Sequence, residues 1–303
     1  MKKNIFALDF LSFSIRLSVI ICILLLHFNA CTLALACSFC PLLVVEKNGK
    51  YWSLIDNMEM IYIPAGLCYQ GSDIGRYDEK PLHKVKLDAF FIDIHEVTNV
   101  QFARFVQTTG YVPQGPWLRG YNVGEDLLPV RYITWYDAKT YAEWTGKRLP
   151  TEAEWEKAAR GTGKTIFPWG DNWSPQVLFS VSGPTPVGTN RLDISPYGCF
   201  DMGGNVFEWV NDWYDRYYYE AFSNDIAINP QGPPDGAEPE EKFIKSKTAA
   251  GNERSTRKVI KSGGWQANFA KNNMRIANRM WANPNYWLND TGFRCAVSAK
   301  KQE

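Results

Sequence analysis

The hydrophobic residues of this chain occur in short runs, three of which have the pattern of β-strands. Residues 58–66 are largely apolar and end in a turn signal at Pro64 and Gly66. Residues 85–93 begin with alternating apolar and polar positions, and residues 291–297 form a short, mostly apolar run near the C-terminus. Such runs, bounded by Gly or Pro, are typical of strands. We therefore expect strands in all three stretches.

Helical spacing appears twice before residue 150. Residues 97–109 place Phe102 and Phe105 one turn apart and are followed by Gly110, which predicts an amphipathic helix that ends at the glycine. A second helix is expected over residues 135–145.

A third helix has the clearest start signal in the chain. Thr151 is a suitable N-cap, Glu154 stands three residues later as its capping-box partner, and Gly161 supplies a stop. In contrast, residues 167–215 are rich in Gly, Pro, Asp and Trp, which favours loops ordered by buried rings. Residues 221–258 change character again, and we expect the second half of this stretch to be a surface excursion.

The first 36 residues have the pattern of an export signal. Lys2 and Lys3 precede an apolar run over residues 17–26, which is followed by several small residues. Cleavage, lipid attachment at Cys31 or Cys37, and an uncleaved membrane anchor all remain open. Each alternative predicts an exported protein, periplasmic or on the cell surface, with membrane association through the N-terminus possible. We divide the remainder into a tether over residues 37–57, one domain over residues 58–298 and a short tail over residues 299–303.

Composition supports a globular domain and gives no sign of a nucleic-acid partner. The chain has 303 residues, of which 45% are hydrophobic, and 33 Lys and Arg balance 32 Asp and Glu. A nucleic-acid-binding surface is expected to carry an excess of positive charge, which is missing here. Aromatic residues make up 15% of the chain, which favours a loop-rich fold pinned by large rings.

Three of the seven cysteines fall within the predicted domain, namely Cys68, Cys199 and Cys295. An oxidising compartment favours one disulfide and one free thiol, while three small buried side chains are an equal alternative. The sequence does not decide which pair would form.

A series of ordered motifs gives the chain a family resemblance. The motifs are Ile63-Pro64-Ala65-Gly66, His95-Glu96-Val97-Thr98-Asn99, Arg148 to Glu156, Phe167-Pro168-Trp169-Gly170, Asp201 to Trp209, and Gly292-Phe293-Arg294. Together they resemble the formylglycine-generating enzyme family, also called sulfatase-modifying factors. The resemblance implies an α+β, loop-rich version of the C-type-lectin-like fold, with few regular helices and strands.

The resemblance also implies a structural calcium site. Family members bind the ion with side chains and backbone oxygens at positions that correspond here to Asp201, Gly204, Val206 and Glu208. Hard oxygen ligands on a tight loop suit Ca²⁺ better than a transition metal. The alternative is that both carboxylates only accept hydrogen bonds from loop amides.

The copper chemistry of the family is not expected in this chain. The family's oxidases bind copper(I) through two cysteines, and an ungapped count back from Arg275-Ile276-Ala277-Asn278-Arg279 places Gln266 and Lys271 at those positions. No cysteine occurs between Cys199 and Cys295, so a shifted alignment does not restore the pair. Copper is therefore not expected, and whether the protein is an enzyme is left open.

The remaining candidate is a binding surface between residues 264 and 293, where asparagines and aromatic residues are frequent. The resemblance implies that this segment lines the substrate groove, and such side chains are adaptable contact groups. The candidate substrate-binding residues are Trp265, Asn268, Asn272, Arg275, Asn278, Arg279 and Trp281. One hypothesis is a pseudoenzyme that binds a peptide, a glycan or an exported protein partner, or assists the maturation of an exported enzyme. The other is an oxygen-dependent oxidase or maturation enzyme of the same superfamily, with a related non-haem metal activity.

Overall fold

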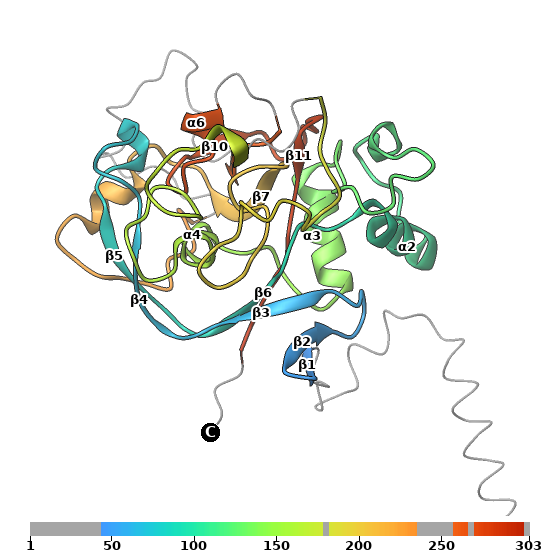
Figure 1. Ribbon diagram of the computed structural model, residues 1–303, viewed down its shortest axis with the longest axis horizontal. Coiled ribbons are helices and arrows are strands. Elements are labelled where there is room, and N and C mark those ends of the chain that lie inside the picture. The colour runs from blue at the N-terminus through green and yellow to red at the C-terminus, as the bar shows by residue number, and fades with distance from the viewer. Residues whose placement is uncertain (1–43, 178–181, 235–256, 266–269, 300–303) are drawn as a thin grey trace, which may run out of the picture. The chain divides into compact units, whose positions relative to one another are not determined.

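The described part of the chain forms three small β-sheets with helices between and beside them (Figure 1). The computed structural model describes residues 44–177, 182–234, 257–265 and 270–299. The five-stranded sheet is antiparallel and has the order β1 (Val44–Lys47), β2 (Lys50–Ser53), β3 (Glu59–Ile63), β6 (Phe90–Asp93) and β12 (Ala296–Ser298). The fold is the mixed α+β, loop-rich type that the family resemblance implied.

The other two sheets each combine antiparallel and parallel pairs. The four-stranded sheet has the order β10 (Met280–Ala282), β9 (Lys258–Lys261), β7 (Phe207–Trp213) and β11 (Thr291–Gly292), with β11 parallel to β7. The three-stranded sheet has the order β4 (Gly66–Gln70), β5 (His83–Leu87) and β8 (Ala227–Ile228), with β8 parallel to β5.

Helices fill the space between and beside the sheets. The α-helices are α2 (Asn99–Thr109), α3 (Trp135–Trp144), α4 (Glu152–Arg160) and the single turn α6 (Ala270–Asn273). Short 3₁₀ turns are η2 (Tyr77–Glu79), η3 (Trp117–Gly120), η4 (Pro175–Val177) and η5 (Tyr218–Phe222). All three helices expected from the sequence are present, and their bounds differ from the prediction by at most two residues.

Threonine capping boxes begin each of the three longer helices. Thr98, Thr134 and Thr151 each accept a hydrogen bond from the backbone amide three residues later, and the side chain at that later position accepts one from the backbone amide of the threonine. Each box satisfies amides that have no partner within the helix. At the other end of α2, Gly110 has φ +68°, the left-handed conformation that stops a helix. The predicted Thr151–Glu154 box is thus confirmed.

The domain begins earlier than the sequence pattern suggested. Residues 44–53, predicted to lie in a tether, form the hairpin β1–β2, and Trp52 pairs with Glu59 of β3. The leader, residues 37–43 and the tail after residue 299 lie outside the described residues. Within the described ranges, no helix is long and apolar enough to cross a membrane.

Two other stretches differ from expectation. The predicted strand over residues 291–297 is two strands in different sheets, because Phe293 to Cys295 cross from β11 to β12. The loop-rich stretch 167–215 contains β7, a strand of seven residues. Of residues 221–258, β8 joins a sheet, and residues 235–256, which include most of the predicted surface excursion, lie outside the described residues.

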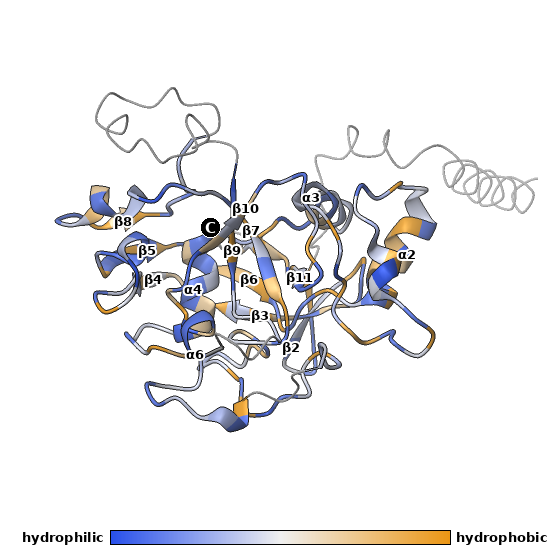
Figure 2. Cartoon of the chain, turned by 90° about the horizontal axis from the view of Figure 1, so that it is seen from above, coloured by the Kyte–Doolittle hydropathy of each residue, from blue (hydrophilic) through white to orange (hydrophobic). Residues whose placement is uncertain are grey.

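The described core consists of two large hydrophobic clusters and one small one. One large cluster packs α2 and α3 against Trp209 and Phe293, and the other packs α4, with Trp155, against β5 and β6. Figure 2 shows the hydrophobic residues along β6 and β9 in the middle of the molecule. Trp155 and Trp209 are completely buried, as expected of residues that pin long loops.

All three cysteines of the domain are free and buried. Cys295 belongs to the first cluster, whereas Cys68 and Cys199 belong to the second. Of the two alternatives for these residues, the structure has the three buried thiols and no disulfide among them.

A network of buried charges holds α4 in place. Glu152 accepts two hydrogen bonds from Arg279, at 2.9 and 3.0 Å, and Lys261 donates to Glu156 at 2.9 Å and to Glu152 at 3.4 Å. Arg160 donates to the second oxygen of Glu156 at 3.0 Å. All five side chains are at least 97% buried. The network therefore ties α4 to β9 and to the segment before β10. Each of these buried charges requires its partner, because an unpaired charge in the protein interior is strongly destabilising.

We expect Arg279→Met to lower the free energy of unfolding by about 3–5 kcal/mol, because it leaves the Glu152 carboxylate buried without its main partner. Urea denaturation followed by circular dichroism measures this change. Arg148→Met is the matched control. Arg148 also forms a two-bond pair, with Glu154, but its side chain is 39% exposed, so a loss of about 1 kcal/mol or less is expected. Equal losses in the two variants would contradict the prediction.

Asp212 predicts a pH dependence of stability. Burial, together with the nearby Glu152 carboxylate, raises the pKa of Asp212 to about 8. The folded chain then keeps a proton that the unfolded chain releases near pH 4, so this stabilisation is complete below about pH 4 and is lost as the pH rises through about 8.

We expect Asp212→Asn to flatten the decline in unfolding free energy between pH 5 and 8, because the asparagine can still accept the 2.9 Å hydrogen bond from the Glu152 amide. Asp225→Asn, at an exposed position, should leave the decline unchanged. Parallel urea titrations across this pH range make the comparison, and a variant as pH-sensitive as the wild type would exclude Asp212 as the source.

Candidate functional site

The loop that leads into β7 carries the positions predicted to bind calcium. Asp201 and Asn205 have positive φ angles, +59° and +61°, and between them Gly203 and Gly204 donate hydrogen bonds to the carboxylate of Asp193. A Cβ on Gly203 would lie 2.7 Å from the Trp169 ring, so the loop can pack this closely only with glycine there. The sequence thus forms a tight, rigid loop at this place.

Glu208, the last predicted calcium ligand, is engaged in a buried ion pair. Arg294 donates to its two carboxylate oxygens at 2.8 and 2.7 Å, and the Trp155 indole donates to one of them at 2.8 Å. Arg294 also donates to the carbonyl of Phe200, next to Asp201. The Gly-Phe-Arg motif and the loop before β7, far apart in sequence, therefore meet in one buried contact.

Acidic groups outnumber basic ones around this pair. Glu96 is completely buried, and neither of its carboxylate oxygens receives a hydrogen bond from a donor group of the described residues. Burial and the neighbouring Asp201 carboxylate raise the pKa of Glu96 well above its usual range, and burial raises that of Asp201 to about 6. Asp193 shows the same effect, with a pKa of about 7, again mainly because of burial. Buried carboxylates with too few donors need a proton or a cation.

These observations decide how far calcium fits the residues present. Asp201 accepts a hydrogen bond from the Gly188 amide at 2.6 Å, and its carboxyl group also lies within hydrogen-bonding reach of Glu96. The Gly204 carbonyl already accepts a bond from the Ser262 hydroxyl, and the charge of Glu208 is balanced by Arg294. In the part of the chain that the structure describes, no three His, Cys, Asp or Glu side chains are placed to hold a metal ion, so a cation here would rely on Asp201 and backbone oxygens. Asp201 would be its main ligand, with Glu208 as a weaker one.

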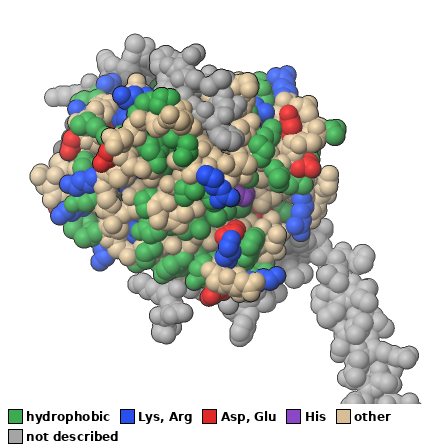
Figure 3. All heavy atoms as spheres, in the orientation of Figure 1, with side chains coloured by type: hydrophobic (Ala, Val, Ile, Leu, Met, Phe, Trp, Pro, Cys, Tyr) green, Lys and Arg blue, Asp and Glu red, His purple; other side chains and the backbone are tan. Residues whose placement is uncertain are grey.

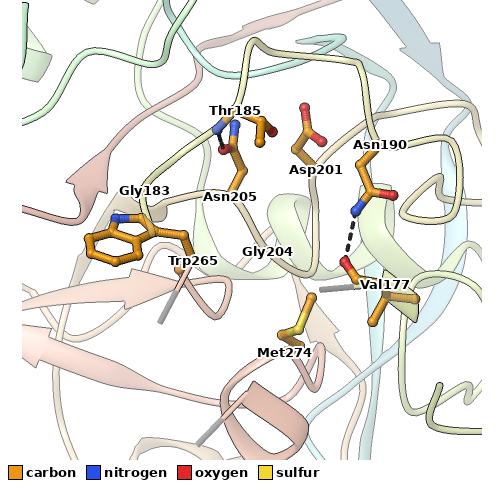
Figure 4. Close-up of a pocket in the computed structure, with 10 residues that line it drawn as sticks. Val177, Gly183, Thr185, Asn190, Asp201, Gly204, Asn205, Trp265 and Met274 are labelled. Carbon is orange, nitrogen blue, oxygen red and sulfur yellow. Dashed lines mark hydrogen bonds between the residues drawn. The ribbon is translucent and has the colours of Figure 1, made fainter. Parts of the chain in front are cut away.

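A small cavity adjoins the same loop (Figure 4). Its volume of about 20 Å³ is enough for one water or one small ion. The Asp201 carboxylate points between Thr185 and Asn190, and Trp265 lies beyond Gly204. Two donors at the cavity, the Asn205 amide nitrogen and the Trp265 indole nitrogen, have no partner among the described residues. The cavity therefore brings one predicted substrate-binding residue close to the predicted calcium loop.

The other predicted substrate-binding residues are spread over different environments. Asn272 is exposed on α6, and Trp281 is 39% exposed on β10. Arg275 pairs with Glu79 through both terminal nitrogens, and Arg279 is completely buried in the α4 network. Asn278 is 2% exposed. Asn268 and Gln266 lie outside the described residues.

Residues 280–287, here called the aromatic segment, present large rings to solvent. Trp287 is 38% and Tyr286 is 63% exposed. The Arg119 guanidinium lies 5.2 Å from the centre of the Trp287 ring, and the Tyr132 ring lies 5.9 Å from it. Arg119 and Tyr132 come from distant parts of the chain, so no sequence motif signals this grouping. Exposed rings held by neighbouring side chains are suited to stacking against a partner.

Several asparagines near this segment have local roles. Asn283 accepts hydrogen bonds from the backbone and side chain of Asn285, which fixes the turn after β10. Asn283 therefore stabilises a turn, whereas the nearby rings of Tyr286 and Trp287 remain exposed. Figure 3 shows hydrophobic side chains spread over one face of the molecule, with acidic and basic groups scattered among them.

The position that corresponds to the second copper-binding cysteine of the family is exposed to solvent. Lys271 lies on α6 and is exposed. The two thiols that flank this segment in sequence, Cys199 and Cys295, are completely buried in separate hydrophobic clusters, and burial raises the pKa of both.

Comparison with known proteins assigns the fold and the motifs to one group. Residues 53–299 match the model of the sulfatase-modifying factor enzyme 1-like domain. The chain belongs to this formylglycine-generating enzyme family. Formylglycine-generating enzyme from Bos taurus is 30% identical over 301 aligned residues, which cover 79% of this chain and 74% of that protein.

Two further proteins are similar to this chain over most of its length. Serine/threonine-protein kinase pkn1 from Chlamydia caviae is 35% identical over 260 residues, or 80% of this chain, and the chain spans only 38% of the length of that kinase. Among solved structures, PvdO from Pseudomonas aeruginosa has a TM-score of 0.62 with 26% identity and covers 84% of this chain and 100% of its own. Family membership therefore fixes the architecture, while the activity depends on the residues of each member's site.

Proposed function

We propose that this chain is a family member that does not oxidise cysteine and that binds a peptide, glycan or exported protein partner. The observation that carries the proposal is Lys271, an exposed ammonium at a position where the family's oxidases hold copper with a thiolate. A relative in Bos taurus, 28% identical, is named "Inactive C-alpha-formylglycine-generating enzyme 2", so loss of the oxidase activity has a precedent among similar proteins.

The aromatic segment is the proposed contact surface. Trp287 presents one ring surface backed by Arg119 and Tyr132, and Trp281 carries Arg257 3.8 Å above its ring. Rings in fixed positions lose little conformational entropy when a partner binds, so they provide affinity at low cost. The predicted export signal would place this partner outside the cytoplasm, where assistance in the maturation of an exported enzyme is one possible role.

A calcium ion next to Asp201 is a second part of the proposal. It would neutralise the acidic surplus of Glu96 and Asp201 and make the loop before β7 more rigid. This support would be structural, since the loop lies beside the cavity that Trp265 lines.

The absence of oxidase activity can be tested directly. After incubation with copper(I), we expect the purified protein to take up no oxygen with a sulfatase peptide that contains cysteine, and mass spectrometry should find no formylglycine. Turnover would overturn the proposal and support the oxidase alternative. In that case, retained activity in Cys295→Ser would exclude the buried thiol as a copper ligand.

The binding role is tested in the same preparations with glycan and peptide arrays. We expect Trp287→Ala to weaken a detected interaction by about tenfold or more, the usual effect of removing a central aromatic contact. Tyr62→Ala is the matched control, because Tyr62 is also an exposed aromatic residue, 43% exposed, but lies on β3. Equal weakening in both variants would exclude the aromatic segment as the contact surface.

Calcium binding predicts a stability change. Calcium at 100 times its dissociation constant should raise the free energy of unfolding by about 2.7 kcal/mol, and EDTA should remove the gain. Asp201→Asn should abolish the response, whereas Asp171→Asn, at an exposed position outside the loop, should preserve it. Differential scanning calorimetry measures both, and an unchanged response in Asp201→Asn would place any bound calcium elsewhere.

A further inference from the structure

A second, larger pocket lies on the described chain apart from the aromatic segment. Its volume is about 330 Å³, within the range of about 300–1,000 Å³ usual for small-molecule sites. It is formed by the loop after β4, the end of α4 with the loop that follows, and the segment before β10. The lining residues are Gly71, Ser72, Asp73, Ile74, Leu82, Arg160, Lys164, Thr165, Ile166, Asp171, Arg275 and Ala277.

The walls of this pocket are fixed by the buried charge network. The Gly71 amide donates to Glu156 at 3.0 Å, and the Gly71 carbonyl accepts from Arg160 at 3.2 Å. A Cβ on Gly71 would lie 2.5 Å from the carbonyl oxygen of Glu79, and Gly71 has φ +82°. Only glycine lets the loop approach the backbone of residues 79–81 this closely. The pocket is thus part of the rigid framework of the fold.

Two arginines, Arg160 and Arg275, line the inner part of the pocket, here called its floor. Arg160 is only 3% exposed, and its Nη1 makes no hydrogen bond to any described residue. The Arg275 side chain is 14% exposed and already neutralised by Glu79, and Ala277 lies beside it in the lining. Two further polar atoms at the floor, Nε of Arg160 and Oγ1 of Thr165, are buried and lack partners among the described residues. Unused donors in such a place favour an acceptor as occupant.

The rim differs from the floor. Lys164 is exposed, with its ammonium 4.4 Å from the centre of the Tyr69 ring, and it forms no ion pair with the residues that the structure describes. Asp73 and Asp171 are exposed and use one oxygen each on a backbone amide, which leaves the other free. Ile74 adds an apolar surface that is 74% exposed. The entrance therefore suits a group that carries apolar atoms and a polar or cationic end.

We propose that this pocket binds a free carboxylate, either of an amino acid or of a peptide C-terminus. The carboxylate enters first and accepts hydrogen bonds from Nη1 of Arg160, since an arginine donor to a carboxylate is stronger than a neutral one. Lys164 adds attraction at the rim, and the apolar walls hold the adjoining side chain. In this orientation, an ammonium or amide group of the ligand lies near Asp73 and Asp171. This site does not depend on the proposed role of the aromatic segment.

The test uses the full chain and three probes, N-acetyl-dialanine with a free carboxylate, the same peptide as its C-terminal amide, and free alanine, each up to about 10 mM. We expect the free carboxylate peptide to bind, as measured by calorimetry, and the amide not to bind. Equal binding of free alanine would identify a free amino acid as the ligand class, and binding of the peptide alone would identify a C-terminus.

Two variants locate the binding. Lys164→Glu should weaken binding at least about fivefold, because it reverses one charge at the rim, while Lys86→Glu, at an exposed position outside the pocket, should not change it. Ala277→Leu fills the floor and should abolish binding. Because Lys164 is exposed, Lys164→Glu is expected to fold, and it still tests the binding site if Ala277→Leu does not fold. Equal affinity for acid and amide, no effect of Lys164→Glu, or no binding of any probe would each overturn the proposal.

Discussion

The contact on which most of this fold depends is the buried pairing of Glu152 and Glu156 with Arg279, Lys261 and Arg160. It joins α4, β9 and the segment before β10, and through Arg160 it also holds the loop after β4. These elements have little regular structure of their own to align them. Ions removed from water must be paired in a defined geometry, so the network imposes positions on elements that hydrophobic packing alone would leave less well defined.

The sequence predicted those elements whose stabilising contacts are local, and missed those that depend on distant partners. Helix starts were predictable, because a capping box is local and its residues, such as Thr151 and Glu154, stand side by side in the sequence. Strand β7 was not predictable, since it alternates poorly and contains Glu208 and Asp212, which look like surface residues until their partners are known. The hairpin β1–β2 was missed because its pattern is weak: three of its eight strand residues are exposed and only one is buried.

The candidate site shows the same division. The family motifs located Asp201, Glu208 and the replaced copper position at Lys271 from the sequence alone. The sequence could not show the contact partners of the site residues. These are Glu96 beside Asp201, Arg294 paired with Glu208, and Arg119 over Trp287. Each pairing joins segments separated by long stretches of chain, and only the packed loops bring them together. The pocket around Arg160 likewise has no sequence motif.

The last strands of the chain also complete the centre of the domain. Segment 291–298 crosses from one sheet to another, and it supplies Arg294 to Glu208 and the Cys295 amide to the Asp93 carboxylate. Without these residues, Glu208 keeps only the Trp155 indole as a donor, Asp93 keeps Lys147, and two sheets lack an edge strand. The last part of the domain to be synthesised therefore completes the buried contacts around β6 and β7.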